Sequence, residues 1–230
     1  RLSAQKEIKL FIEKGEATTY PKRTYAELSH KIGGQFVGHE YVGEYSWVNV
    51  PEITLPGNFR AHAYYLKYEG PGWESDKTAF RFYLDNRNAI DVFGKRVTDI
   101  VLPAVGVDGY ESYHHPAAWG MDNMKVGNSL GIGSIGIWNG EKAVRVEKRD
   151  STTCSILSNG KIRSQIKTVY HGWDANGRKC DLTSVISIDA GSRASRMQLS
   201  TDKTIDNFAT GLIKSKGIEL IVRNNSQDEW

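Results

Sequence analysis

The chain has 230 residues, of which 39% are hydrophobic and 25% are charged, and its formal net charge is only +3. This composition is that of a globular protein, and so small a charge argues against a nucleic-acid partner. No apolar run approaches the roughly 20 residues that a membrane-spanning helix needs, so we expect no membrane partner either.

The first half of the chain favours short strands. Residues 24–29 fit both a helix N-terminus and an alternating strand, but Pro21 just before them favours an extended backbone, so we expect a strand. Residues 35–72 mix aromatic residues with proline and glycine, which is typical of short strands joined by ordered loops. Residues 80–84, FRFYL, alternate clearly and predict a strand with Phe80, Phe82 and Leu84 on one face.

The second half predicts a meander of longer strands. Alternation indicates strands at residues 143–147, 161–170, 179–188, 193–199 and 212–222, and Asn-Gly pairs at 139–140, 159–160 and 176–177 predict hairpin turns. No stretch predicts an amphipathic helix. We therefore expect an all-β, antiparallel β-sandwich spanning residues 1–230 as a single domain, and the start at Arg1 predicts a fragment of a longer chain.

The two cysteines, Cys154 and Cys180, have no metal-binding spacing. They either pair across neighbouring strands or remain as two buried thiols. Sequence does not decide, because pairing depends on the distance between their Cα atoms.

Residues 110–136 contain the densest group of reactive side chains in the chain, and we interpret them as the active surface. The glycines at 131, 133 and 136 match a dinucleotide-binding pattern formally, but a hairpin signal follows where a helix should begin. Tight strand packing, or close approach of the backbone to a ligand, explains these glycines better.

His114 and His115 are candidate metal ligands, with Asp122, Asp108 or Asp85 completing the site. Adjacent residues of an extended chain point to opposite sides, so at most one of the two is expected in a given site. We expect no cofactor and leave a divalent metal ion open.

Other hydrolytic chemistries have less support. Serine-histidine-acid catalysis has little support, because the serines near the histidines are unremarkable. A glycosidase pair could be drawn from Asp85, Asp91, Asp122 and Glu111, but nothing in the sequence selects two of them.

The remaining set suits proton abstraction beside a carboxylate, and its members are Tyr110, Tyr113, His114, Lys125 and Arg87, flanked by Trp73 and Trp119. Cationic groups would neutralise the substrate carboxylate as charge moves onto it, and a His or Tyr would transfer protons. The indoles would stack on sugar rings. The structural alternative is that the aromatic residues pack in the core while Arg87 pairs with Asp85 or Asp91.

Several blocks of sequence resemble the bacterial family named domain of unknown function 4861. The blocks read YPKRTYAE at 20–27, YEGPGWESD at 68–76, LDNRNAIDVFGK at 84–95, YHHPAAWGMD at 113–122 and KVGNSLG at 125–131. The resemblance implies a carbohydrate-active enzyme of the periplasm or a secreted one, within a larger β-supersandwich like that of galactose mutarotase. It also implies a lyase that removes water from the uronic acid at the non-reducing end of an anionic, ulvan-like oligosaccharide, leaving a 4,5-unsaturated uronyl residue.

The resemblance also assigns roles by position. His114, Tyr113, Arg87 and Lys125 are implied as catalytic, and Trp73, Trp119, Asp122, Tyr110 and Arg23 as substrate-binding residues. His115 departs from the family pattern, so we favour His114. The expected partners are the oligosaccharide and a second fragment of the same polypeptide, and the alternatives are a non-catalytic carbohydrate-binding module, a mutarotase or a glycoside hydrolase on the same fold.

Overall fold

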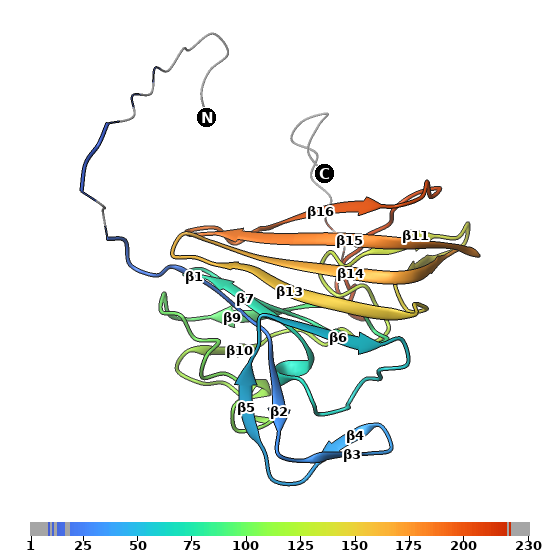
Figure 1. The fold of residues 1–230 in the computed structure, drawn as a ribbon, viewed down its shortest axis with the longest axis horizontal. Helices are drawn as coiled ribbons and strands as arrows, with labels where there is room; N and C mark the ends of the chain where they lie inside the picture. The colour runs from blue at the N-terminus through green and yellow to red at the C-terminus, as the bar shows by residue number, and fades with distance from the viewer. Residues whose placement is uncertain (1–8, 10, 12, 17–18, 220, 222–230) are drawn as a thin grey trace.

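The computed structural model describes residues 9, 11, 13–16, 19–219 and 221. It is 45% strand and 3% helix. Antiparallel sheets pack against each other, so the predicted all-β sandwich is confirmed (Figure 1).

Two five-stranded sheets form the sandwich. The first, in spatial order, contains β1 (Thr24–Glu27), β7 (Gly72–Ser75), β8 (Ala79–Phe82), β9 (Ile90–Lys95) and β10 (Gly120–Asp122). The second contains β16 (Ser195–Thr201), β15 (Arg178–Asp189), β14 (Arg163–Ala175), β13 (Ser151–Asn159) and β6 (Glu52–Pro56). All the strand pairings within both sheets are antiparallel.

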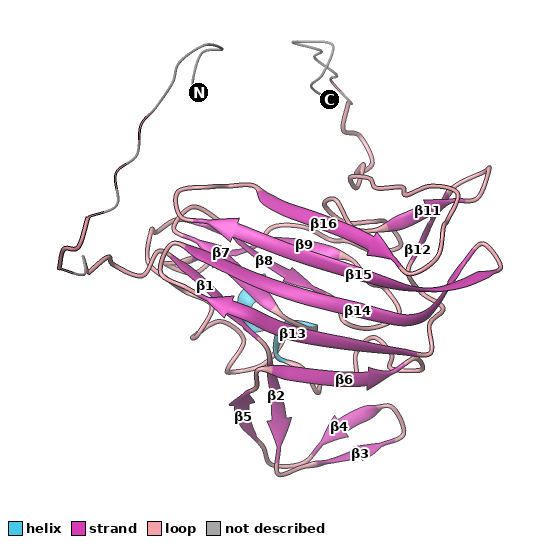
Figure 2. Cartoon of the chain, turned by 45° about the horizontal axis from the view of Figure 1, so that its top comes forward, coloured by secondary structure: helices cyan, strands magenta, loops and turns pink. Residues whose placement is uncertain are grey.

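Three smaller ladders flank the sandwich. They are β2 (Ser29–Ile32) with β5 (Ser46–Asn49), β3 (Gln35–Val37) with β4 (Glu40–Val42), and β11 (Gly136–Trp138) with β12 (Ala143–Arg145). The first two project from the body of the molecule beyond β6 (Figure 2). Two short 3₁₀ helices, η1 (Lys67–Glu69) and η2 (Ser112–His114), lie in the loops of the first sheet.

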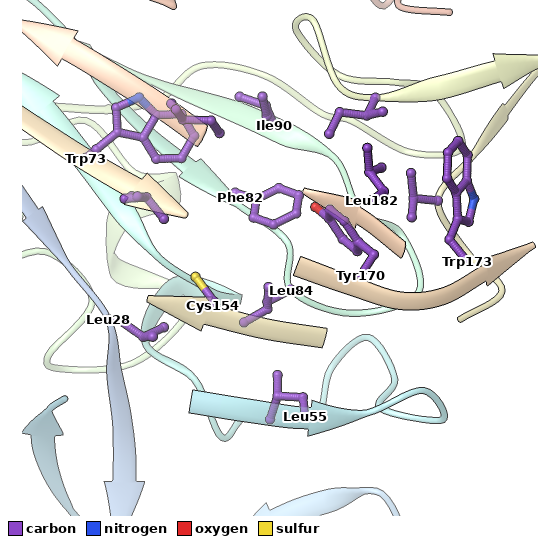
Figure 3. Packing of buried hydrophobic residues seen from close by; sticks show 14 of the residues in the cluster. Leu28, Leu55, Trp73, Phe82, Leu84, Ile90, Cys154, Tyr170, Trp173 and Leu182 are labelled. Carbon is purple, nitrogen blue, oxygen red and sulfur yellow. The ribbon is translucent and has the colours of Figure 1, made fainter. Parts of the chain in front are cut away.

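The main core lies between the two sheets. Phe82 and Ile90 from the first sheet face Tyr170 and Leu182 from the second (Figure 3), and the rings of Phe82 and Tyr170 meet edge to face with centroids 6.5 Å apart. Each such fully buried apolar side chain contributes about 1.5–3 kcal/mol. This packing fixes the first sheet against the second.

A second cluster covers the opposite face of the first sheet. Successive residues of a strand point to opposite faces, so Phe80 and Phe82 enter the main core while Ala79 faces outward. There Ala79 packs with Phe93 and Tyr113 beneath the loops that contain residues 101–113. The first sheet is therefore buried on both faces over much of its area.

A bulge in β14 keeps two large aromatic side chains in the core. The register against β15 shifts between Tyr170 and Trp173, and Gly172 within the shift has φ +59. The extra residue places Trp173 on the same face as Tyr170, although they are three positions apart. Asp181 secures the bulge by accepting the Gly172 N–H at 2.8 Å.

The predicted strands are confirmed in their positions except the last. The structure has β1 and β2 for residues 24–29, β8 for 80–84, and β12, β14, β15 and β16 for the first four strands of the second half. The strand predicted at 212–222 is wrong over residues 212–219, where only an isolated bridge from Leu212 to Ile132 occurs. Residues 220 and 222 lie outside the described residues.

The Asn-Gly pairs close hairpins as predicted. Asn176 and Gly177 join β14 to β15 with φ 57 and 82, the left-handed conformation that a type I′ turn requires at both positions. The pair at 139–140 lies between β11 and β12, with positive φ at Gly140 only. Asn159 ends β13 and Gly160 follows it before β14, and neither has positive φ.

Cys154 and Cys180 are two free, buried thiols. Of the two alternatives left by the sequence, the structure therefore shows the unpaired one. Burial raises the pKa of the Cys154 thiol to about 12, so it stays protonated at neutral pH.

Two of the three glycines at 131–136, Gly131 and Gly136, serve strand packing. Gly131 has φ +61 and forms a parallel bridge with Ile90, and a Cβ at this position would lie 2.0 Å from the Ile90 carbonyl oxygen. Gly136 begins β11, so a strand stands where a dinucleotide-binding fold would begin a helix.

Gly131→Ala is expected to destabilise the protein more than Gly133→Ala. Both glycines have positive φ, but nothing lies within 4 Å of a Cβ at Gly133. Gly133→Ala therefore reports backbone strain, of more than about 0.4–1 kcal/mol, and the difference between the variants reports the clash with Ile90. Equal midpoints of urea unfolding would contradict this role of Gly131.

The described part of the chain contains no helix long and apolar enough to cross a membrane.

Candidate functional site

A cleft of about 830 Å³ opens at the outward face of the first sheet. Its walls come from β8, β10, η2 and the loops around residues 62–69, 87 and 123–126. The lining residues are His62, Glu69, Arg81, Tyr83, Arg87, Glu111, His114, His115, Met121, Asp122, Asn123, Met124, Lys125 and Val126. Segments distant in sequence thus meet in one cavity rich in titratable groups.

Arg81 forms the floor of this cleft. It is 2% exposed, and its Nη2 donates to Asp91 Oδ2 at 2.7 Å and to Asp122 Oδ2 at 2.5 Å. Its Nη1 donates to the Tyr113 hydroxyl at 3.0 Å. Although burial lowers the pKa of Arg81, the surrounding tyrosines and carboxylates raise it above its ordinary value, so the guanidinium remains a fixed cation.

Asp122 lies between Arg81, on the floor of the cleft, and His114. His114 Nδ1 lies 3.2 Å from Asp122 Oδ2, and the His114 side chain is 43% exposed while that of Asp122 is 1% exposed. Burial raises the pKa of Asp122, against the lowering effect of Arg81. The arrangement is a half-exposed histidine oriented by a buried carboxylate, which suits a group that transfers protons.

Arg87 lies on another wall and is held by two carboxylates. Its Nη2 lies 2.5 Å from both Asp85 Oδ2 and Glu69 Oε1, and its guanidinium stacks 3.9 Å from the centre of the Tyr83 ring. The structural alternative for Arg87, an ion pair with Asp85, is therefore present. Its Nη1 forms no hydrogen bond with any described residue.

Lys125 lies exposed on the rim. The described residues include no hydrogen-bond or ion-pair partner for its ammonium group. An anionic ligand could therefore pair with Lys125, and no existing contact of this side chain with a described residue would have to break.

The structure thus brings four of the predicted residues, Arg87, His114, Asp122 and Lys125, to one cleft. Tyr113 lies just behind it, 2% exposed, with its ring centroid 4.6 Å from that of His114. Burial raises the pKa of Tyr113, so its hydroxyl is a neutral phenol that accepts from Arg81.

The other predicted substrate-binding residues lie elsewhere. Trp73 is 1% exposed in the main core, stacked on Phe80, with its Nε1 donating to Ser195 Oγ at 2.8 Å. Trp119 packs on Phe93. Tyr110 is half-buried, and its hydroxyl donates to the Leu66 carbonyl.

Arg23, immediately before β1, pairs with Asp76 at 2.8 Å and does not line the cleft. Its partner has a lowered pKa because the Arg23 contacts and the Gly191 N–H outweigh burial, which raises it. Arg23 therefore serves a local ion pair in this structure.

Sequence reasoning missed Arg81, Glu69 and His62. For Arg81 a signal existed, because it sits between Phe80 and Phe82 in an alternating strand. A charged residue there points away from the core face, and two aromatic neighbours indicate that the strand is buried. Glu69 and His62 carry no such signal, because they reach the cleft through loop conformation.

The described residues assemble no set of metal ligands at His114 and His115. Among the described residues, His, Cys, Asp and Glu side chains form no group of three or more that could hold a metal ion.

Comparison with known proteins gives the family. The model of the family described as "Domain of unknown function (DUF4861)" matches residues 1–230. The chain belongs to this family.

A relative of this DUF4861 chain is "Uncharacterized protein P7" of Formosa agariphila. The two are 28% identical over 177 residues, which covers 67% of this chain and 43% of the relative. The chain therefore spans less than half the length of the curated relative it matches. No solved structure matches the chain.

Proposed function

We propose that this DUF4861 protein is a carbohydrate-active lyase that eliminates water from the uronic acid at the non-reducing end of an anionic, ulvan-like oligosaccharide. The product is a 4,5-unsaturated uronyl residue. The observation that carries the proposal is the His114–Asp122 pair, at 3.2 Å, in a cleft that also presents Arg87 and Lys125.

His114 is the base in this mechanism. With Nδ1 protonated and turned to Asp122, Nε2 is free to take the C5 proton of the uronyl unit. The buried carboxylate orients the ring and stabilises the imidazolium that forms, a contribution of about 10²- to 10⁴-fold for a positioned acid or base.

Lys125 and the free Nη1 of Arg87 bind the uronate carboxylate. The C5 proton is weakly acidic. As this proton leaves, negative charge moves onto the carboxylate of the substrate, so cations placed beside the carboxylate lower the barrier. Arg87 is preorganised by Asp85 and Glu69, and Lys125 pairs with the substrate when it binds.

The test is an assay with saturated uronyl oligosaccharides, read as the rise in absorbance of the unsaturated uronate. We expect activity in the wild type and a loss of about 10²- to 10⁴-fold in His114→Gln. His115→Gln is expected to lose less, because no carboxylate among the described residues pairs with His115, whereas Asp122 lies beside His114. His39 lies on the exposed turn between β3 and β4. His39→Gln is therefore the control for the effect of replacing a histidine outside the cleft.

Three results would count against the proposal. An undiminished rate in His114→Gln would show that His114 is not the base. Oligosaccharide binding without turnover in the wild type indicates a carbohydrate-binding module. Release of reducing sugar, or anomeric exchange seen by proton NMR, indicates a hydrolase or a mutarotase.

A further inference from the structure

We propose that His62 is the second proton-transfer residue of the cleft, the acid that protonates the leaving hydroxyl group. The inference rests on the proposed function and deepens it. His62 lines the same cavity as His114 but comes from the segment between β6 and η1, whereas His114 belongs to η2. Two imidazoles on separate segments can approach different atoms of one sugar ring.

Elimination of water needs such a second group when the C–H and C–O bonds break together. Hydroxide is a poor leaving group, so the C4 oxygen must receive a proton as its bond to carbon breaks. The base, His114, already holds the proton taken from C5 and cannot supply this one at the same moment.

The tyrosines near the cleft are not suited to this role. The Tyr83 hydroxyl donates to Asp91 Oδ2 at 2.7 Å, and burial raises its pKa well above the ordinary range. Tyr113 is buried behind Arg81. Imidazole is the side chain whose unperturbed pKa lies nearest neutral pH, which favours a histidine of the cleft over Glu111 as the acid. His115 is the neighbour of His114 in sequence and shares its backbone, so His62 is the histidine that comes from a separate segment.

Glu69 gives His62 an orienting partner. His62 Nδ1 lies 3.9 Å from Glu69 Oε1, and the side chains are 66% and 10% exposed. This separation is longer than a hydrogen bond, as is common for catalytic contacts before substrate binds. Glu69 Oε1 also accepts from Arg87, so the proposed acid and the carboxylate clamp share one anchor.

The backbone around His62 is held in an unusual conformation. His62, Tyr64, Tyr68 and Glu69 all have positive φ, at 58, 53, 36 and 71, which is rare for residues with side chains. Backbone hydrogen bonds fix the segment at Ala63, Tyr65 and Glu69 through their carbonyl groups. Strain maintained in this way is concentrated at functional sites, and here it aims His62 and Glu69 at the cavity.

The C5–H bond breaks and its proton moves to His114 Nε2, while its electron pair forms the C4=C5 double bond. The C4–O bond breaks, and the oxygen takes a proton from the His62 imidazolium to leave as water. His114 then releases its proton to solvent and His62 takes one up, so no oxidant or further reactant is needed.

The experiment compares two substrates that differ only at C4 of the terminal uronyl unit, one with the natural hydroxyl and one with fluorine. Fluoride leaves without a proton, so it does not need the acid. The test variant is His62→Asn, because asparagine tolerates the positive φ at this position. Unchanged midpoints of thermal unfolding show that the variants fold.

We expect His62→Asn to lose about 10²- to 10⁴-fold on the hydroxyl substrate and less than about tenfold on the fluoro substrate. His114→Gln is expected to lose both activities, and His39→Gln to keep both. Full activity of His62→Asn on the hydroxyl substrate, or equal losses on both substrates, overturns the assignment. Wild-type protein that eliminates neither water nor fluoride overturns the proposed function itself.

Discussion

Replacing Arg81 with methionine is expected to lower the free energy of unfolding by about 3–5 kcal/mol. The guanidinium is buried and is the shared cation of Asp91 and Asp122, which are themselves buried. Methionine fills a similar volume but removes the guanidinium that both carboxylates share, leaving the half-exposed His114 beside Asp122. The measurement is urea unfolding of the variant and the wild type at neutral pH.

The loss is expected to shrink in acid. Burial already raises the pKa of Asp122 with Arg81 present, and removing the cation raises it further. A carboxyl whose pKa is higher in the folded than in the unfolded chain binds protons on folding, so it opposes folding increasingly as the pH rises above its unfolded pKa of about 4. Below that pH both states are protonated and the difference is smallest.

Arg163→Met is the matched control. Arg163 pairs with Asp189, and their side chains are 59% and 52% exposed, so the change is expected to cost far less than Arg81→Met, because an exposed ion pair contributes little to stability. Similar losses in the two variants, or a loss in Arg81→Met that does not depend on pH, would contradict the buried network.

Trp73→Ala is expected to cost about 3–5 kcal/mol, because it empties the space of a fully buried indole in the main core. The ring stacks on Phe80 with centroids 5.5 Å apart, and its N–H bond to Ser195 ties β7 to β16. The midpoint of thermal unfolding checks this result.

Trp138→Ala provides the control, since Trp138 is 49% exposed in β11. We expect it to change stability little. A Trp73→Ala variant that kept its unfolding midpoint while losing oligosaccharide binding would contradict the core position and support the stacking role implied by the family resemblance.

The sandwich could be predicted from sequence where strands are long and their turns are explicit. Residues 161–188 alternate over two strands and meet at Asn176 and Gly177, so local information suffices. The pairing of β6 with β13 could not be predicted, because it joins residues about a hundred positions apart that no hairpin connects directly. The order of strands in a sheet is a property of the whole chain.

The site was predictable only in part, for a similar reason. His114, Asp122 and Lys125 lie close together in sequence and share the cleft, whereas Trp73 turns into the core because β7 presents that face to the second sheet. Chemistry-bearing residue types can be read from sequence, but their orientation depends on which faces are covered.

The strand β8 has a consequence for how this protein can change over time. Its alternate residues serve two purposes, since Phe80 and Phe82 fill the core while Arg81 supports the cleft. A substitution in β8 that alters the floor of the cleft therefore also weakens the sandwich. New substrate preferences are accordingly expected to evolve at the rim of the cleft. Directed evolution should accordingly vary exposed positions such as Lys125 and Asn123 and leave β8 intact.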